Sequence, residues 1–210
     1  YKVACSQPLH KLVMFSPTPR LGMIAKFLNQ SAQVGHEMDG NSLMHSAERR
    51  YEVEDDAAPL DMLVALFGAR GWPCEVSADE ICGEIQGSWA KYQLRGVWRS
   101  DDRVLQILCL PDIRIGSEKR SAAHELVALA NEQMWLGHFD IWSNGSVLLY
   151  RNGTLLGDEG LLSLDQAQAL VEIAVEECDR FYPAFQFVLW GDKEPRAALE
   201  AAMVEAVGEA

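Results

Sequence analysis

Residues 89–110, WAKYQLRGVWRSDDRVLQILCL, decide the fold. In the first half of this stretch, apolar and polar side chains alternate, so that Tyr92, Leu94 and Trp98 share one face of a strand. The polar residues 99–102 predict a turn, and a second strand follows over 103–110. The stretch therefore predicts two antiparallel strands of a meander.

Further strands extend this sheet in both directions along the chain. Upstream, 74–76 and 81–86 are short strand-like runs, the second ending at Gly87. Downstream, 139–142 and 147–151 flank the dipeptide Asn144-Gly145, the strongest short-range hairpin signal in the sequence. A meander of five or six antiparallel strands is the prediction.

Helical patterns surround these strands rather than alternating with them. Apolar residues at helical spacing over 60–67 predict a helix that stops at Gly68 or Gly71. Ser117 is a candidate N-cap for a second helix reaching about residue 136. This order of elements predicts the α+β class, with helices packed against the antiparallel sheet.

Two more helices are predicted in the last third of the chain. Ser163, with Gln166 three residues on, forms a capping box that opens a long helix. Pro183 within that pattern predicts a kink or a restart, because proline lacks the N–H that the helix needs. A final helix follows the bend at residues 191–192.

Charge divides the chain into two parts. Residues 1–50 hold six Lys and Arg against three Asp and Glu, and since the whole chain has 18 and 31, the remaining residues hold twelve basic and 28 acidic side chains. We therefore expect a basic extension with an acidic linker over 1–57, poorly ordered or not native to the domain, and a folded domain over 58–210. The alternative for the first fifty residues is a tail that binds an acidic partner.

Composition excludes several classes of protein. A net charge of -13 disfavours binding to phosphate backbones, so we expect no nucleic-acid partner for the domain. No apolar run is long enough to span a membrane. Five irregularly spaced cysteines do not resemble a disulfide framework, which favours a cytoplasmic location.

Residue patterns for catalysis and cofactors are missing. The glycines form no phosphate-binding loop, no Cys/His pairs have zinc-ligand spacing, and no nucleophile elbow occurs. We expect no enzyme activity, no cofactor, no metal and no catalytic residues. The carboxylates of one predicted helix are interpreted as a solvated face: Glu172, Glu176, Glu177 and Asp179.

Aromatic and apolar strand residues are the remaining feature. Most are expected in the core, but aromatic residues also dominate protein interfaces. Residues 104–110 are apolar on both faces, which predicts that a helix or a second subunit covers the second face of the sheet. The candidate surface for a partner or for a homodimer consists of Trp89, Tyr92, Trp98, Leu105, Ile107, Trp135 and Trp190.

Four segments resemble a known family: GSW at 87–89, LQILC at 105–109, NEQMWLGHFD at 131–140 and FYPAFQFVLWG at 181–191. They are similar to the YbjN-domain family of bacterial sensory transduction regulators, over residues 58–208. The resemblance implies a fold like that of type III secretion chaperones, often dimeric and without a cofactor. It implies no catalytic residues.

Together these observations favour a non-enzymatic, chaperone-like or stress-regulatory protein that binds basic or apolar segments of other proteins. The alternative is a small-molecule sensor or an enzyme with a pocket between sheet and helices. His138 and Asp140 are then the first residues to test, as the close His/Asp pair of the domain.

Overall fold

The computed structural model describes residues 56–142 and 146–208, with side chains as far as Met203. The predicted extension over 1–57 lies outside the described residues, except for Asp56 and Ala57. These two residues form β1 (Asp56–Ala57), which pairs antiparallel with β8 (Leu162–Ser163). The last two residues of the predicted linker therefore form a strand.

A six-stranded antiparallel sheet forms the centre of the fold. Its order is β2-β3-β4-β5-β7-β6. The antiparallel pair predicted from residues 89–110 is confirmed, with Leu94 opposite Cys109 and Trp98 opposite Leu105. The structure places this pair in the middle of the sheet. The α+β class is confirmed. The strands are β2 (Cys74–Val76), β3 (Glu80–Gln86), β4 (Lys91–Arg99), β5 (Val104–Leu110), β6 (His138–Trp142) and β7 (Val147–Leu155).

The helix before the sheet ends where its sequence predicts. It is α2 (Pro59–Arg70), with Gly71 as C-cap in the left-handed conformation at φ 68°. The second helix differs from its prediction. A short 3-10 turn, η3 (Ser117–Lys119), precedes α3 (Arg120–Asn131), and the Ser117 hydroxyl contacts Glu118 instead of capping the helix.

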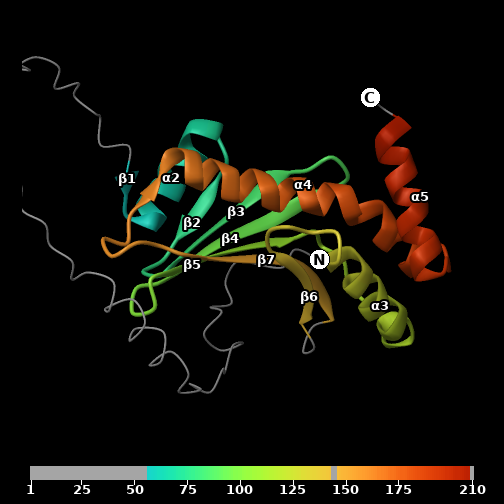
Figure 1. Cartoon of the computed structure of the whole chain (residues 1–210). Helices are drawn as coiled ribbons and strands as arrows, with labels where there is room; N and C mark the ends of the chain where they lie inside the picture. Colours follow the sequence, from blue (N-terminus) through green and yellow to red (C-terminus); the bar gives the residue numbers. More distant parts are fainter. Residues whose placement is uncertain (1–55, 143–145, 209–210) are drawn as a thin grey trace, which may run out of the picture. The chain divides into compact units, whose positions relative to one another are not determined.

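The long helix α4 (Leu164–Leu189) begins at the predicted capping box, where the Gln166 N–H donates to the Ser163 hydroxyl. The helix contains Pro183 and continues to Leu189 rather than restarting. The last helix is α5 (Pro195–Gly208). In Figure 1, α4 crosses the sheet with α2 near its first turns and α3 and α5 near its last turns.

The core lies on one face of the sheet. On β5 the alternate residues Leu105, Ile107 and Cys109 are fully buried in one cluster with side chains from α2, α3, α4 and α5. This packing requires a residue without a Cβ at Gly96 on β4, because a Cβ there would lie 2.5 Å from the Leu63 side chain. The four described helices thus pack on the same side of the sheet.

The opposite face also holds apolar side chains. Leu108 and Leu149 are almost completely buried although they lie outside the main cluster. Leu108 lies between Arg95 on β4 and Arg151 on β7, whose aliphatic portions can cover it. No helix of the described residues covers this face, and its cover by a helix or by a second subunit stays a prediction.

Candidate functional site

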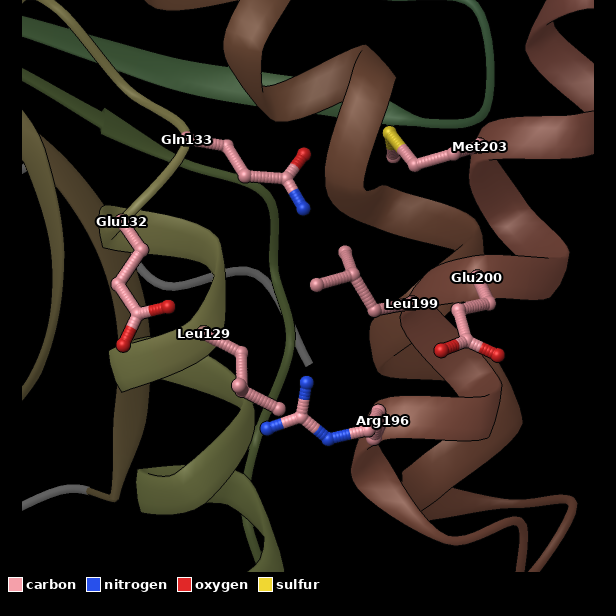
Figure 2. Close-up of a pocket in the computed structure, with 7 residues that line it drawn as sticks. All are labelled: Leu129, Glu132, Gln133, Arg196, Leu199, Glu200 and Met203. Atoms are coloured by element: carbon pink, nitrogen blue, oxygen red, sulfur yellow. The ribbon is translucent and has the colours of Figure 1, made fainter.

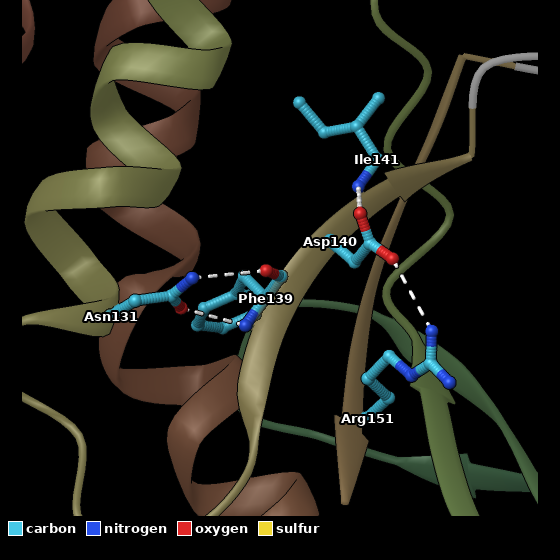
Figure 3. A network of polar contacts seen from close by, with 5 residues as sticks. All are labelled: Asn131, Phe139, Asp140, Ile141 and Arg151. Atoms are coloured by element: carbon cyan, nitrogen blue, oxygen red, sulfur yellow. Dashed lines mark hydrogen bonds and ion pairs between the residues drawn. The ribbon is translucent and has the colours of Figure 1, made fainter. Parts of the chain in front are cut away.

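The Asn131 side chain closes the turn between α3 and β6 by pairing with the backbone of β6 as a neighbouring strand would. Asn131, the last residue of α3, donates from Nδ2 to the Phe139 carbonyl oxygen at 3.1 Å and accepts the Phe139 N–H at 2.8 Å (Figure 3). Asparagine can do both because its amide carries a donor and an acceptor. The helix end is thereby fixed to the first residues of β6.

A glycine and a tyrosine fix the other half of this turn. Gly137 has φ 66°, in the left-handed region, and a Cβ there would lie 2.3 Å from the Tyr150 hydroxyl oxygen. The same hydroxyl donates to the Leu136 carbonyl oxygen at 3.1 Å. A side chain at position 137 would therefore displace Tyr150 from the turn as well as strain the backbone.

Trp135 stands on this fixed turn with 98% of its surface exposed, and Leu136 beside it is 51% exposed. The exposure of two large apolar side chains to water is unfavourable. Such a pair on a rigid backbone is typical of an interaction site. We call Trp135 and Leu136 the exposed turn.

An open pocket lies between α3 and α5, with a volume of about 360 Å³, and its lining ends at Gln133, two residues before the exposed turn. We call it the α3–α5 groove. Figure 2 shows Leu199 between the two helices, with Leu129 on the α3 side and Met203 on the α5 side. These three side chains form an apolar floor.

The rim of the α3–α5 groove is polar. Glu132 and Gln133 belong to the α3 side, and Arg196 and Glu200 to the α5 side (Figure 2). Within residues 56–142 and 146–203, the side chains of Glu132, Arg196 and Glu200 have no ion-pair partner. Their charges are therefore available to a bound molecule.

The remaining predicted surface residues have different surroundings. Tyr92, Leu105 and Ile107 are fully buried, so they contribute to the core and not to a surface. Trp98 is partly buried against the core cluster. Trp190, just after α4, is 62% exposed.

Trp89 is half exposed, yet it has a structural role. Its indole Nε1–H donates to the Asp179 carbonyl oxygen at 2.9 Å, and its ring stacks on Tyr182 at 6.4 Å between centroids. The next residue of α4, Arg180, donates to the Gln133 side chain at 3.2 Å, two residues before the exposed turn.

Most of the carboxylates interpreted as a solvated helix face have a hydrogen-bond or ion-pair partner. Glu172 pairs with Arg70 on α2 at 2.8 Å, and Asp179 accepts hydrogen bonds from the loop between β3 and β4. Burial raises the pKa of Glu177, an effect that Arg180 opposes. Glu176 is exposed and the Glu172 side chain keeps 43% of its surface exposed, so the solvated-face interpretation is wrong only for Glu177 and Asp179.

The His138 and Asp140 pair does not form a dyad. Both oxygens of Asp140 are used, one by the Ile141 N–H at 2.8 Å and the other by Arg151 at 3.5 Å (Figure 3). The two residues share one face of β6, opposite the helices. The α3–α5 groove lies between two helices, whereas the alternative hypothesis placed its pocket between sheet and helices.

The thiols of Cys109 and Cys178 are buried where β5 meets α4. Both are free cysteines, at 0% and 1% exposure. Burial raises the pKa of Cys178, and Cys109, Asp179 and Glu177 raise it further. Cys178 is consequently a protonated, unreactive thiol at neutral pH.

The described residues contain neither a metal-ligand cluster nor a membrane-spanning helix. No group of His, Cys, Asp and Glu side chains in this part of the chain is arranged to hold a metal ion. None of the helices described here is both long and apolar enough to cross a membrane.

These elements define an α+β domain, a six-stranded antiparallel sheet with helices on one face and an exposed aromatic turn. The family model YbjN, described as "Putative bacterial sensory transduction regulator", matches residues 59–187. The chain therefore belongs to the YbjN family and to a family of regulators. No curated protein and no solved structure matches the chain, so the likeness to type III secretion chaperones stays a prediction.

Several residues of the site were missed in the sequence. The apolar residues of the groove belong to helical stripes, which are equally typical of core positions. Asn131 and Gly137 lie within the 131–140 segment that carries the family resemblance, and Gly137 directly after Trp135-Leu136 signals a turn. Nothing local to Arg196 or Glu200 indicates that α5 packs beside α3.

Proposed function

We propose that this protein is a regulator that acts by binding another protein, in the manner of a chaperone that holds an apolar segment. The observation that carries the proposal is the exposed turn, with Trp135 at 98% exposure two residues after Gln133 on the rim of the α3–α5 groove. The family description as a regulator supports it.

Rigidity of the exposed turn is the physical reason. A partner that binds a mobile loop must order it, and each immobilised side chain costs about 0.5–1.5 kcal/mol. Asn131, Gly137 and Tyr150 have already ordered this turn. Trp135 can therefore contribute its large apolar area to binding at little entropic cost, which is the property of an interface hot spot.

The proposal is tested by photo-crosslinking in the native host. Trp135 is replaced by a photoreactive phenylalanine analogue, and Trp89 is replaced in the same way as the matched control, since it is also exposed but bonded to α4. We expect one defined protein adduct from position 135 that is absent from position 89, and loss of the same partner from the Trp135→Ala variant. No adduct at position 135, or equal adducts at both positions, would overturn the proposal.

A further inference from the structure

We infer that the α3–α5 groove is a receptor for a short basic amphipathic helix of the partner protein. This inference deepens the proposed function and rests on it, because it states which chemistry the partner presents next to the exposed turn. The argument uses the shape of the groove, its floor, and the charges on its rim.

The shape of the groove fits a helix. Its walls are two helices in contact, α3 and α5, and a third helix packs naturally into the channel between two others. On α5 the lining extends from Arg196 to Met203, which at the helical rise corresponds to about 10 Å or two turns. The occupant is thus a short helix rather than a long one.

The floor of the groove selects apolar side chains. Leu199 and Met203 are four residues apart on α5, so they lie one above the other, with Leu129 on the α3 side (Figure 2). Leu199 is 5% exposed, so an apolar stripe at helical spacing on the partner would cover chiefly Leu129 and Met203, which are only partly buried. Methionine adds tolerance, because its flexible thioether adapts to different partner side chains.

Charge selects basic flanks on the occupant. Glu132 and Glu200 lie on opposite sides of the groove, and neither has an ion-pair partner in the described residues. Lysine or arginine on both sides of the partner's apolar stripe would meet them. Arg196 favours the C-terminal end of the bound helix, where backbone carbonyl groups carry partial negative charge.

Net charge favours this occupant over a second copy of the chain. Each chain carries -13, so two copies repel one another, whereas a basic segment is attracted and its association accelerated. A homodimer formed through the groove is therefore one of the outcomes that the test must separate from the inference.

The probe is a synthetic peptide of about four helical turns, with leucine along one face and lysine elsewhere. A second peptide carries glutamate in place of lysine. Binding to the full chain is measured by titration calorimetry. We expect the lysine peptide to bind and the glutamate peptide to fail.

Two double variants of equal charge locate the binding site. The first is Glu132→Gln with Glu200→Gln, in the rim of the groove. The matched control is Glu75→Gln with Glu159→Gln, two exposed carboxylates on β2 and on the loop after β7. We expect the rim variant to weaken lysine-peptide binding about fivefold and the control to leave it unchanged. Circular dichroism melting checks that both variants fold.

Three results would overturn the inference. Equal weakening by both double variants would mean attraction by net charge alone, and binding of the glutamate peptide would mean that the rim does not select basic side chains. A stable dimer that the rim variant dissociates would mean that a second copy occupies the groove. The crosslink from position 135 is independent of these results, so a partner captured there with no effect of the rim variant would leave the proposed function standing without this inference.

Discussion

The Tyr92 hydroxyl on β4 donates to the Asp179 carboxylate on α4 at 2.5 Å. The same carboxylate accepts the backbone N–H and the hydroxyl of Ser88, at 2.8 and 2.9 Å. Gly87 makes this approach possible, because a Cβ there would lie 2.1 Å from the Tyr92 ring. Burial, and next the hydrogen bond and charge of Asp179, raise the pKa of Tyr92 far above its ordinary value, which keeps the hydroxyl a donor.

The first prediction concerns this link between the sheet and the long helix. Asp179→Ala removes the acceptor of three hydrogen bonds, and bonds to charged groups contribute more than neutral ones. We expect a loss of about 2–4 kcal/mol in the free energy of unfolding, measured by urea denaturation. Glu176→Ala, an exposed position on the same helix, should change it by less than about 0.5 kcal/mol. A loss no larger than that of the control would contradict a structural role for Asp179.

The sheet was predictable because its signals are local. Alternation over 89–98, the turn at 99–102 and the Ser163 capping box each act within a few residues, and each is present in the structure. The link between Tyr92 and Asp179 joins residues 87 positions apart, and no local pattern indicates it. From the sequence, Asp179 cannot be told apart from the other carboxylates of the same helix, because its hydrogen-bond partners lie far away along the chain.

The candidate surface was predictable only in part, for a related reason. Alternation shows that Tyr92 and Trp98 share a face, but not which face of the sheet the helices cover. Tyr92, Leu105 and Ile107 therefore proved to be core residues. The end of α3 was missed because Asn131 ends the helix through hydrogen bonds to Phe139, eight residues ahead.

The second prediction tests the exposed turn. Gly137→Ala forces a Cβ against the Tyr150 hydroxyl and into a left-handed backbone conformation, so we expect a loss of about 1–3 kcal/mol in the free energy of unfolding. Gly153→Ala on β7 is the matched control, since its Cβ would meet nothing closer than 3.9 Å. Equal effects of the two substitutions in urea denaturation would show that Gly137 is replaceable.

The third prediction concerns thiol reactivity. Cys109 and Cys178 are buried and Cys178 has a raised pKa, whereas Cys74 on β2 is partly exposed. In the folded protein, iodoacetamide should modify Cys74 first and leave Cys109 and Cys178 unmodified until denaturant is added. Peptide mass spectrometry over a time course measures this order. Early modification of Cys178 would mean that α4 separates readily from β5.

The fourth prediction is a pH dependence of stability caused by Glu177. Its Oε2 is buried without a hydrogen-bond partner in the described residues, and its nearest cation, Arg180, lies at 3.6 Å. Burial raises the pKa of Glu177 above its ordinary value of 4.5, so the folded state binds the proton more tightly than the unfolded chain. The fold therefore loses stability as the pH rises from 4.5 through the raised pKa.

Glu177→Gln keeps the shape of the side chain and removes its ionisable carboxyl group. We expect the variant to melt at a higher temperature than the natural chain, with a difference that grows as the pH rises above 4.5. Glu176→Gln is the control, because it removes the same charge at the neighbouring exposed position and should show no such growth. A melting difference that is constant with pH, or that shrinks as the pH rises, would mean that burial does not raise the pKa of Glu177 in the folded protein.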